Sequence, residues 1–440
     1  MVDTEATRVG RRRRLHPAWS VAAVAFVALI GAAGFRAAPG VLMVPLQEEF
    51  GTSRGVLSAA VGINLVLFGL TAPFAAALID RFGIRRVTAI ALVLVSAGSA
   101  LSVFITTGWQ LVFTWGLMIG LGTGSMALVF AATVANRWFV KRRGLVTGIL
   151  TAGSATGQLI FLPLIAWVAG GAGWRAASLI IAAAALVVVP LVLVFLRDRP
   201  ADLGLTPYGA PPDYREPTPV DAGSAAGRAI GALRQASHSR TFWALAAGFA
   251  ICGATTNGLI GTHFVPAAHD HGLPQTTAAG LLAVVGIFDI VGTIASGALT
   301  DKVNPRILLA IYYALRGVGL LMLPALLSDT VHVSIIAFVV VYGLDWVATV
   351  PPTVALCREA FGEQGTVVFG WVFAAHQLGA ALMSVVAGVL RDAVGDYTLA
   401  WFSAAALCAV AAGISLGIRR LPAGWPGSSP DHPAGPATVS

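Results

Sequence analysis

Long apolar stretches, each about long enough to cross a bilayer, recur along almost the whole chain. A helix needs roughly 20 apolar residues to span the hydrocarbon core. Twelve stretches meet this length, at residues 18–46, 55–77, 87–106, 109–134, 144–169, 174–196, 241–267, 275–299, 306–327, 332–356, 365–390 and 396–418. They lack the alternation of barrel strands, so helices must satisfy their backbone groups in lipid. Because 11% of the 440 residues are charged, against roughly 25% in soluble domains, we predict an all-α membrane protein with twelve transmembrane helices.

The basic residues that give the net charge of +8 are distributed unevenly among the predicted loops. If both termini lie inside, nearly all basic residues fall in cytoplasmic segments, and the outer loops keep Arg54, Arg175 and Arg391. The positive-inside rule then predicts a multi-pass protein of the inner or plasma membrane with cytoplasmic termini, and no nucleic-acid partner. The three cysteines fall inside apolar stretches or directly at the end of one, without the spacing of a metal site. We therefore predict no metal and no cofactor.

A polar interruption divides the chain into two halves. Residues 197–240 are rich in proline, glycine, alanine and charge, as expected of a cytoplasmic linker. The linker separates predicted six-helix bundles at 18–196 and 241–420, with a basic tail at 1–17 and a disordered tail at 421–440.

The two halves also match in register. Four residues of the first half each lie 221 positions before a similar residue of the second: Asp80 and Asp301, Arg85 and Arg306, Arg137 and Arg358, Gly144 and Gly365. A constant offset across two separate loops indicates two parallel repeats. Parallel repeats with a binding site between them are typical of secondary transporters.

The loop at 76–86 carries a recognisable motif. It reads Ala-Ala-Leu-Ile-Asp-Arg-Phe-Gly-Ile-Arg-Arg and resembles the Gly-x-x-x-Asp-Arg-x-Gly-x-Arg-Arg signature of the major facilitator superfamily, with Ala76 replacing the first glycine. The second copy, Gly297 to Arg306, keeps an Asp-Lys pair but loses the later basic cluster. The resemblance covers nearly the whole chain and implies the fold of that superfamily. It also implies a cytoplasmic gate formed by Asp80, Arg81, Arg85, Arg86, Asp301 and Lys302; a loop charged for topology alone is the alternative.

Five ionisable residues lie inside the predicted helices: Arg36, Asp289, Arg316, Asp345 and His376. Such residues face protein or water and mark functional sites. At a rise of ~1.5 Å per residue, all except Arg36 lie ~15 Å from the cytoplasmic face, near the midplane. Asp289 and Arg316 lie at matching depth on two helices joined by a short loop, and we therefore predict an ion pair between them. Asp345 has no such neighbour and is the better candidate proton carrier, with a structural role beside the tandem prolines as the alternative.

Arg36 is the predicted anion-binding residue. The resemblance implies that the first helix lines the cavity, and this helix carries no acidic residue near Arg36. A guanidinium can bind a carboxylate through two parallel hydrogen bonds, although a pair with Asp345 is equally compatible. The further polar candidates for substrate contact are Asn257, His376, Gln377 and Gln158, residue types that also serve in helix packing.

Two segments resemble the monocarboxylate-porter and oxalate/formate-antiporter branch. They are Gly261 to Gly272 and the Gly-Ile-Phe-Asp-Ile-Val-Gly segment around Asp289. In that branch an arginine one turn after the aspartate takes part in carboxylate transport, whereas this chain has Thr293 there. The resemblance implies transport of a small organic anion by alternating access, coupled to protons or to anion exchange.

Proton-coupled efflux of drugs is the alternative function. Pumps of that kind usually carry a Gly-Pro pair in the fifth helix and an arginine in the fourth, and this chain has neither. The sequence also contains no nucleotide-binding Gly-Lys-Ser/Thr loop and no catalytic constellation. We therefore predict a transporter driven by a gradient, and not an enzyme. We also predict that it is a monomer.

Overall fold

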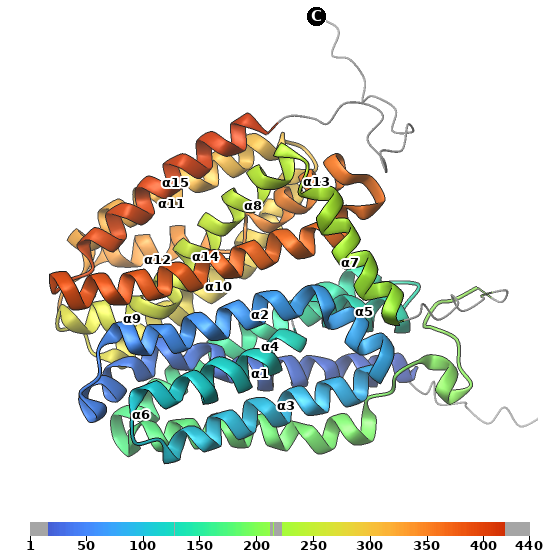
Figure 1. Ribbon diagram of the computed structural model, residues 1–440, viewed down its shortest axis with the longest axis horizontal. Coiled ribbons are helices and arrows are strands. Elements are labelled where there is room, and N and C mark those ends of the chain that lie inside the picture. Colours follow the sequence, from blue (N-terminus) through green and yellow to red (C-terminus); the bar gives the residue numbers. More distant parts are fainter. Residues whose placement is uncertain (1–15, 127, 212–213, 215–221, 419–440) are drawn as a thin grey trace, which may run out of the picture.

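The computed structural model describes residues 16–126, 128–211, 214 and 222–418, and these residues form long helices that run side by side (Figure 1). The first half contains α1 (Pro17–Phe50), α2 (Arg54–Phe82), α3 (Ile84–Leu101), η1 (Ser102–Phe104), η2 (Gly108–Gln110), η3 (Val112–Ile119), α4 (Gly120–Ser125), α5 (Leu128–Trp138) and α6 (Arg143–Phe195). The segments η3, α4 and α5 follow one another and together make one crossing.

The second half follows a short connecting region. This region contains η4 (Pro200–Leu203) and α7 (Ala222–Ala236). The second half contains α8 (Arg240–Gly253), η5 (Ala254–Ile260), α9 (Gly261–Asp270), α10 (Gln275–Thr300), α11 (Pro305–Leu326), α12 (Val333–Asp345), α13 (Val350–Phe361), η6 (Gly362–Gln364), α14 (Gly365–Val394) and α15 (Thr398–Gly417).

The 53-residue α6 is two crossings joined by a kink. Gly173 has φ 85° and ψ 164°, which is outside the helical region and accessible at low cost only to glycine. A straight helix of this length would be ~80 Å long, more than twice a bilayer core. Residues on the two sides of Gly173 therefore run in opposite directions. Eleven helical segments of the described chain are long and apolar enough to cross a membrane, and with α6 counted as two they confirm the twelve predicted helices.

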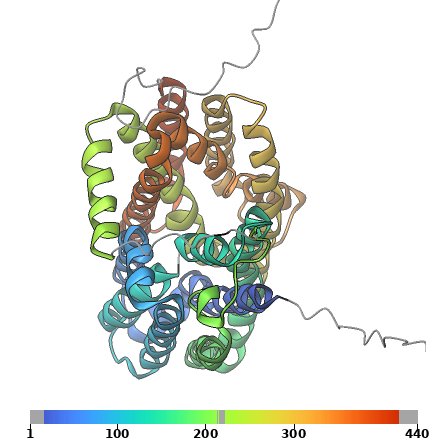
Figure 2. The same cartoon turned by 90° about the vertical axis from the view of Figure 1, so that its right-hand side faces the viewer.

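The two halves pack as separate groups of helices, seen along their axes in Figure 2. The contacts between the halves are made mainly by α2 with α14, by α6 with α10, and by α1 with α9. We call the end where α7 lies the linker end and the opposite end the far end. At the linker end, α7 packs on both α2 and α14 (Figure 1).

Candidate functional site

A cavity lies between the two halves, near the middle of the helices that line it. α1, α2, α4 and α6 line it from the first half, and η5, α9, α10 and the α12–α13 connection line it from the second. Its volume is about 80 Å³, several times the roughly 10–15 Å³ that one water molecule needs. Its polar and aromatic side chains are those of Phe35, Arg36, Asn64, Phe68, Thr123, Gln158, Asn257, Thr262, Asp289 and Trp346. A molecule bound in this cavity would contact both halves.

Arg36 supplies a positive charge to this cavity. Its guanidinium carbon lies 5.2 Å from the centroid of the Phe68 ring on α2. Within the residues that the structure describes, Arg36 makes no ion pair and no hydrogen bond. A cation–π contact contributes only about 0.5–2 kcal/mol, which leaves most of the desolvation cost of the guanidinium uncompensated. Its hydrogen-bond donors therefore remain available to an anion in the cavity.

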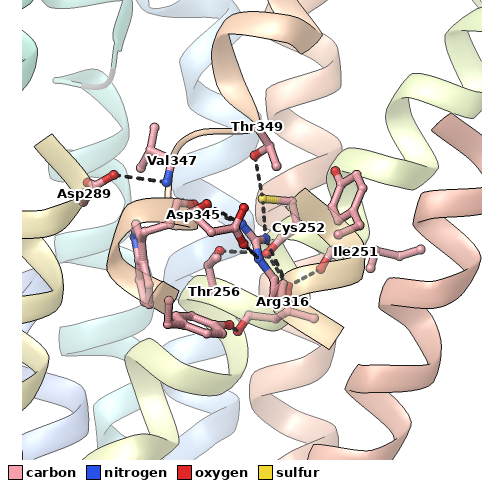
Figure 3. Close-up of polar contacts among 12 residues, drawn as sticks. Ile251, Cys252, Thr256, Asp289, Arg316, Asp345, Val347 and Thr349 are labelled. Atoms are coloured by element: carbon pink, nitrogen blue, oxygen red, sulfur yellow. Dashed lines mark hydrogen bonds and ion pairs between the residues drawn. The ribbon is translucent and has the colours of Figure 1, made fainter. Parts of the chain in front are cut away.

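Asp289 brings a carboxylate to the same cavity. One carboxylate oxygen, Oδ1, accepts hydrogen bonds from Thr293 Oγ1 and from the backbone nitrogen of Val347, each at 3.1 Å (Figure 3). Val347 lies between α12 and α13, where the helix is interrupted and its backbone N–H groups lose their helical partners. Asp289 therefore faces the cavity and also holds the α12–α13 connection.

Arg316 pairs with Asp345 and not with Asp289 (Figure 3). Its Nε donates to Asp345 Oδ2 at 2.6 Å, and its Nη2 donates to the Asp345 carbonyl oxygen at 2.7 Å. Arg316 is 1% exposed and Asp345 is 5% exposed. The expected pair between Asp289 and Arg316 is thus wrong, and so is the expectation that Asp345 lacks a partner on a nearby helix.

The α12–α13 connection is fixed by side chains from several helices. Besides the bond from Val347 to Asp289, Ser296 Oγ on α10 donates to the carbonyl of Ala348 at 2.5 Å. Thr349 Oγ1 lies 3.2 Å from Cys252 Sγ on α8, and the same sulfur accepts from Arg316 Nη1 at 3.0 Å. This bracing places Trp346 against the cavity.

Two of the four predicted polar contacts, Gln158 and Asn257, line the cavity. Neither side chain has a hydrogen-bond partner among the described residues. Asn257 belongs to η5, a π-helical segment whose wider turn often occurs at functional sites.

The other two predicted contacts, His376 and Gln377, lie in helix packing away from the cavity lining. The His376 ring lies between Phe249 and Phe373, at centroid distances of 4.7 and 5.8 Å. Gln377 packs its Cβ against Gly69 on α2, so closely that a Cβ on that glycine would lie 2.6 Å away. Both residues therefore lie outside the cavity lining, although Phe373, which stacks on His376, also packs against Phe68, the ring that Arg36 contacts.

The predicted gate residues lie at the linker end, and among the described residues none of the ion pairs and hydrogen bonds of their side chains crosses to the other half. Asp80 pairs with Arg137, and the backbone nitrogen of Arg85 donates to Asp198 at 2.9 Å. Arg81 and Arg86 are exposed, as are Asp301 and Lys302 of the second copy. In the second half Arg306 pairs with Glu359 at 2.9 Å, and the described residues show no pair between Asp301 and Arg358 that would repeat the Asp80 contact.

Sequence reasoning missed Trp346 and Thr123 in the cavity, and an ionic cluster at the far end that includes Arg54 and Asp270. Trp346 directly follows Asp345, a charged residue inside the membrane region, and this position was a signal that Trp346 lies near the functional site. Thr123 lies in a run of alternate glycines and gives no comparable signal. The far-end charges lie at helix ends, where a charge needs no special explanation.

Known proteins resemble this chain over most of its length. The family profile of the Major Facilitator Superfamily matches residues 22–369. An uncharacterized MFS-type transporter of Bacillus subtilis (strain 168), YcxA, is 26% identical over 92% of this chain and 95% of its own length. Monocarboxylate transporter 13 of Bos taurus is 29% identical over 90% of this chain and 88% of its own.

Solved structures show the same fold at low sequence identity. A D-xylose–proton symporter is 16% identical, covers 90% of this chain and 97% of its own, and has a TM-score of 0.69. A bacterial homologue of the human lysosomal transporter Spinster, in an inward-facing and unoccupied conformation, is 17% identical, covers 91% and 96%, and has a TM-score of 0.68. The family match extends over most of both helical halves, and this multi-pass membrane protein belongs to the major facilitator superfamily of transporters.

Proposed function

We propose that this transporter carries a small organic anion whose carboxylate binds Arg36. The observation that supports the proposal most directly is the position of Arg36 in the central cavity without an ion-pair partner among the described residues. A guanidinium offers parallel N–H donors that match the two oxygens of a carboxylate. Binding an anion there would neutralise a charge that is otherwise costly inside a membrane protein.

The remaining lining of the cavity suits a small, partly apolar anion. Gln158 and Asn257 offer amide groups for a hydroxyl or carbonyl of the substrate, while Phe35, Phe68 and Trp346 offer apolar surface. The relatives named as monocarboxylate transporters, with 29% identity over most of the chain, point to the same substrate class. In the monocarboxylate-porter branch an arginine stands where this chain has Thr293. Arg36 on α1 would therefore supply the cation that binds the carboxylate.

Asp289 is the carboxylate that we assign to proton coupling. It lines the cavity together with Arg36, whereas Asp345 is engaged by Arg316 outside the cavity. Proton binding at Asp289 would remove a negative charge from the space that an anion enters. Exchange of one anion for another, without a proton, is the alternative mode of coupling.

Efflux of cationic drugs is the second candidate function, and the presence of Asp289 in the cavity is what favours it. A carboxylate in a cavity with aromatic walls can bind an organic cation. The cavity volume of about 80 Å³ argues for a smaller substrate.

We place the protein in a cell membrane with its linker end on the cytoplasmic side, because the basic loops lie at the linker end. The motif residues Asp80 and Arg137 then form part of a cytoplasmic gate, together with the pair of Arg306 and Glu359. The whole cavity is built by one chain, in keeping with a functional monomer.

Uptake by proteoliposomes tests the proposed substrate class. Purified protein is assayed with a panel of short-chain carboxylates and a panel of cationic dyes, with and without a pH gradient. We expect carboxylate uptake without dye transport. Arg36→Gln should raise the KM for the carboxylate roughly 10- to 100-fold, because a hydrogen-bonded charge contact is worth about 1.5–3 kcal/mol, and Arg36→Lys should have a smaller effect.

Arg228→Gln, on the exposed part of α7, is the matched control for losing one arginine. Its KM should equal that of the unmodified protein. If Arg36→Gln and Arg36→Ala both transport the carboxylate with unchanged KM, Arg36 does not bind the anion. Dye transport without carboxylate transport would favour the efflux pump.

A further inference from the structure

An ionic cluster joins the two halves at the far end. Arg54, the first residue of α2, donates from both terminal nitrogens to Asp270 at the end of α9, each at 2.7 Å. Arg391 on α14 donates to the same carboxylate at 2.9 Å. Arg54 is 3% exposed, so its bidentate contact is shielded from water and is stronger than a surface ion pair.

The second half also caps the start of α2. The two carboxylate oxygens of Asp392 accept from the backbone nitrogens of Arg54 and Gly55, at 3.1 and 2.7 Å. These N–H groups have no partner within α2, and a carboxylate at a helix N-terminus is favoured by the helix dipole. Both contacts cross the boundary between the halves, and both would break if the halves separated at this end.

His263 is connected to this cluster through Tyr397. Arg54 Nη1 donates to the Tyr397 hydroxyl oxygen at 2.9 Å. The same hydroxyl lies 3.1 Å from His263 Nδ1, and His263 Nε2 lies 2.8 Å from the carbonyl oxygen of Ser384 on α14. His263 is 0% exposed.

These partners define the protonation state of His263. A carbonyl oxygen only accepts, so Nε2 of His263 carries a hydrogen and donates to Ser384. Burial raises the pKa of Tyr397 to about 12, so its hydroxyl keeps a hydrogen and donates it to Nδ1. Every donor and acceptor in this series of hydrogen bonds, from Arg54 through Tyr397 and His263 to the carbonyl of Ser384, is satisfied while the imidazole is neutral.

A proton on Nδ1 would disrupt this arrangement. The Tyr397 oxygen would face two donors, Arg54 and His263, and its own hydrogen would lose its acceptor. Two buried cations would then share one oxygen atom, at a cost that exposure to water would relieve.

We propose that this cluster is a proton-sensitive latch, which holds the far end closed while His263 is neutral and releases it when His263 binds a proton. The proposal rests on the alternating access of the proposed function and adds its regulation by external pH. The charged groups facing His263 from other segments are Arg54 on α2 and Asp392 on α14, with Asp270 on its own helix, and the neutral Tyr397 before α15 is the further titratable group. Of the other neighbours, α1 carries Arg36 in the cavity and Glu48 and Glu49 near the far end, and α10 carries Asp289.

Thiol labelling of the purified transporter in detergent tests the latch without a substrate. Ser58 on α2 is 0% exposed, and it lies against Gly388 on α14 in the closed far end. Its replacement, Ser58→Cys, reports opening by its rate of reaction with a maleimide. The three native cysteines are buried. Thr106→Cys, at an exposed far-end position, corrects for the effect of pH on the reagent.

The corrected labelling rate should rise about tenfold from pH 7.5 to pH 5.5, if the imidazole in the open state titrates near 6.5 as it does in water. His263→Gln should abolish this rise while keeping labelling slow at pH 7.5. Asp270→Asn should accelerate labelling at pH 7.5, because it weakens the latch without changing His263. Thermal unfolding of each variant checks that it is folded.

Two results would overturn the latch. One is an unchanged tenfold rise in His263→Gln, and the other is slow labelling at pH 7.5 in Asp270→Asn. A wrong substrate class can be distinguished from a wrong latch, since carboxylate uptake can be absent while the labelling rate still depends on His263.

Discussion

Arg36 and Arg316 are both guanidinium groups inside the membrane region, and their surroundings give them different roles. Arg316 is enclosed by Asp345 and Cys252, whereas Arg36 faces the cavity with Phe68 beneath it. Arg36 was predicted as the cavity cation because the family resemblance implies that the first helix lines the cavity and because this helix has no acidic residue near Arg36. Depth along each helix did not predict the partner of Arg316, because it leaves open the direction in which each side chain points.

Replacing the cavity carboxylate should separate transport from proton coupling. We expect Asp289→Asn to lose the stimulation of uptake by a pH gradient, because an amide cannot take up a proton, while anion exchange at equal pH continues. Uptake measured with and without the gradient checks this. The matched control is Asp202→Asn, at an exposed position of η4 in the connecting region, which should keep the stimulation. A gradient response that survives in Asp289→Asn would assign coupling to another group.

The buried pair of Arg316 and Asp345 should matter for folding and not for affinity. Arg316→Met or Asp345→Asn alone leaves an uncompensated polar group or charge, and breaking a buried pair costs about 3–5 kcal/mol. We expect each single variant to lower the midpoint of thermal unfolding strongly. The double variant Arg316→Met with Asp345→Asn should lose less than the sum of the two, since it removes both charges. A fully additive loss would mean that the two groups do not stabilise each other.

At the scale of helices, hydropathy predicted where each crossing lies but not how it is interrupted. The kink at Gly173 was foreseen as a boundary between two apolar stretches, because a 53-residue helix is too long for one crossing. The π-helical segments η3 and η5 were not foreseen, since neither the apolar residues of η3 nor the polar Thr255, Thr256 and Asn257 of η5 distinguish a π-helical turn from an α-helical one. The connecting region was predicted as linker, yet it contains the amphipathic α7, which packs on both halves.

The seam between α2 and α14 should be sensitive to added volume. A Cβ at Gly69 would lie 2.6 Å from Gln377 Cβ and 3.3 Å from the carbonyl oxygen of Ala374. We expect Gly69→Ala to force the two helices apart at a cost of about 1–3 kcal/mol, and so to speed the labelling of Ser58→Cys roughly fivefold or more. Gly280→Ala on α10, where nothing lies within 4 Å of the new Cβ, is the matched control and should leave the rate unchanged. Equal rates in both variants would show that the seam tolerates a methyl group.

At the scale of the whole molecule, the two ends of the transporter are held by different kinds of contact. At the far end, charged side chains join the halves through Asp270 and Asp392. At the linker end, the motif charges stay within their own halves. There the halves meet through α7 and through aromatic contacts such as Phe74 with Trp371. The register match between the halves predicted the paired gate motifs, but the charges of the far end lie outside that repeat and were not predicted as a cluster.

This difference gives the solvent separate control over each end. Cooling weakens contacts between apolar surfaces, whereas salt screens mainly those charged groups that water reaches. Because Trp371 also donates a hydrogen bond to the carbonyl of Ala229 on α7, at 2.8 Å, part of the adhesion at the linker end is unaffected by ionic strength. Cooling should therefore loosen the linker end more than the far end, where the buried Arg54 is shielded from dissolved ions.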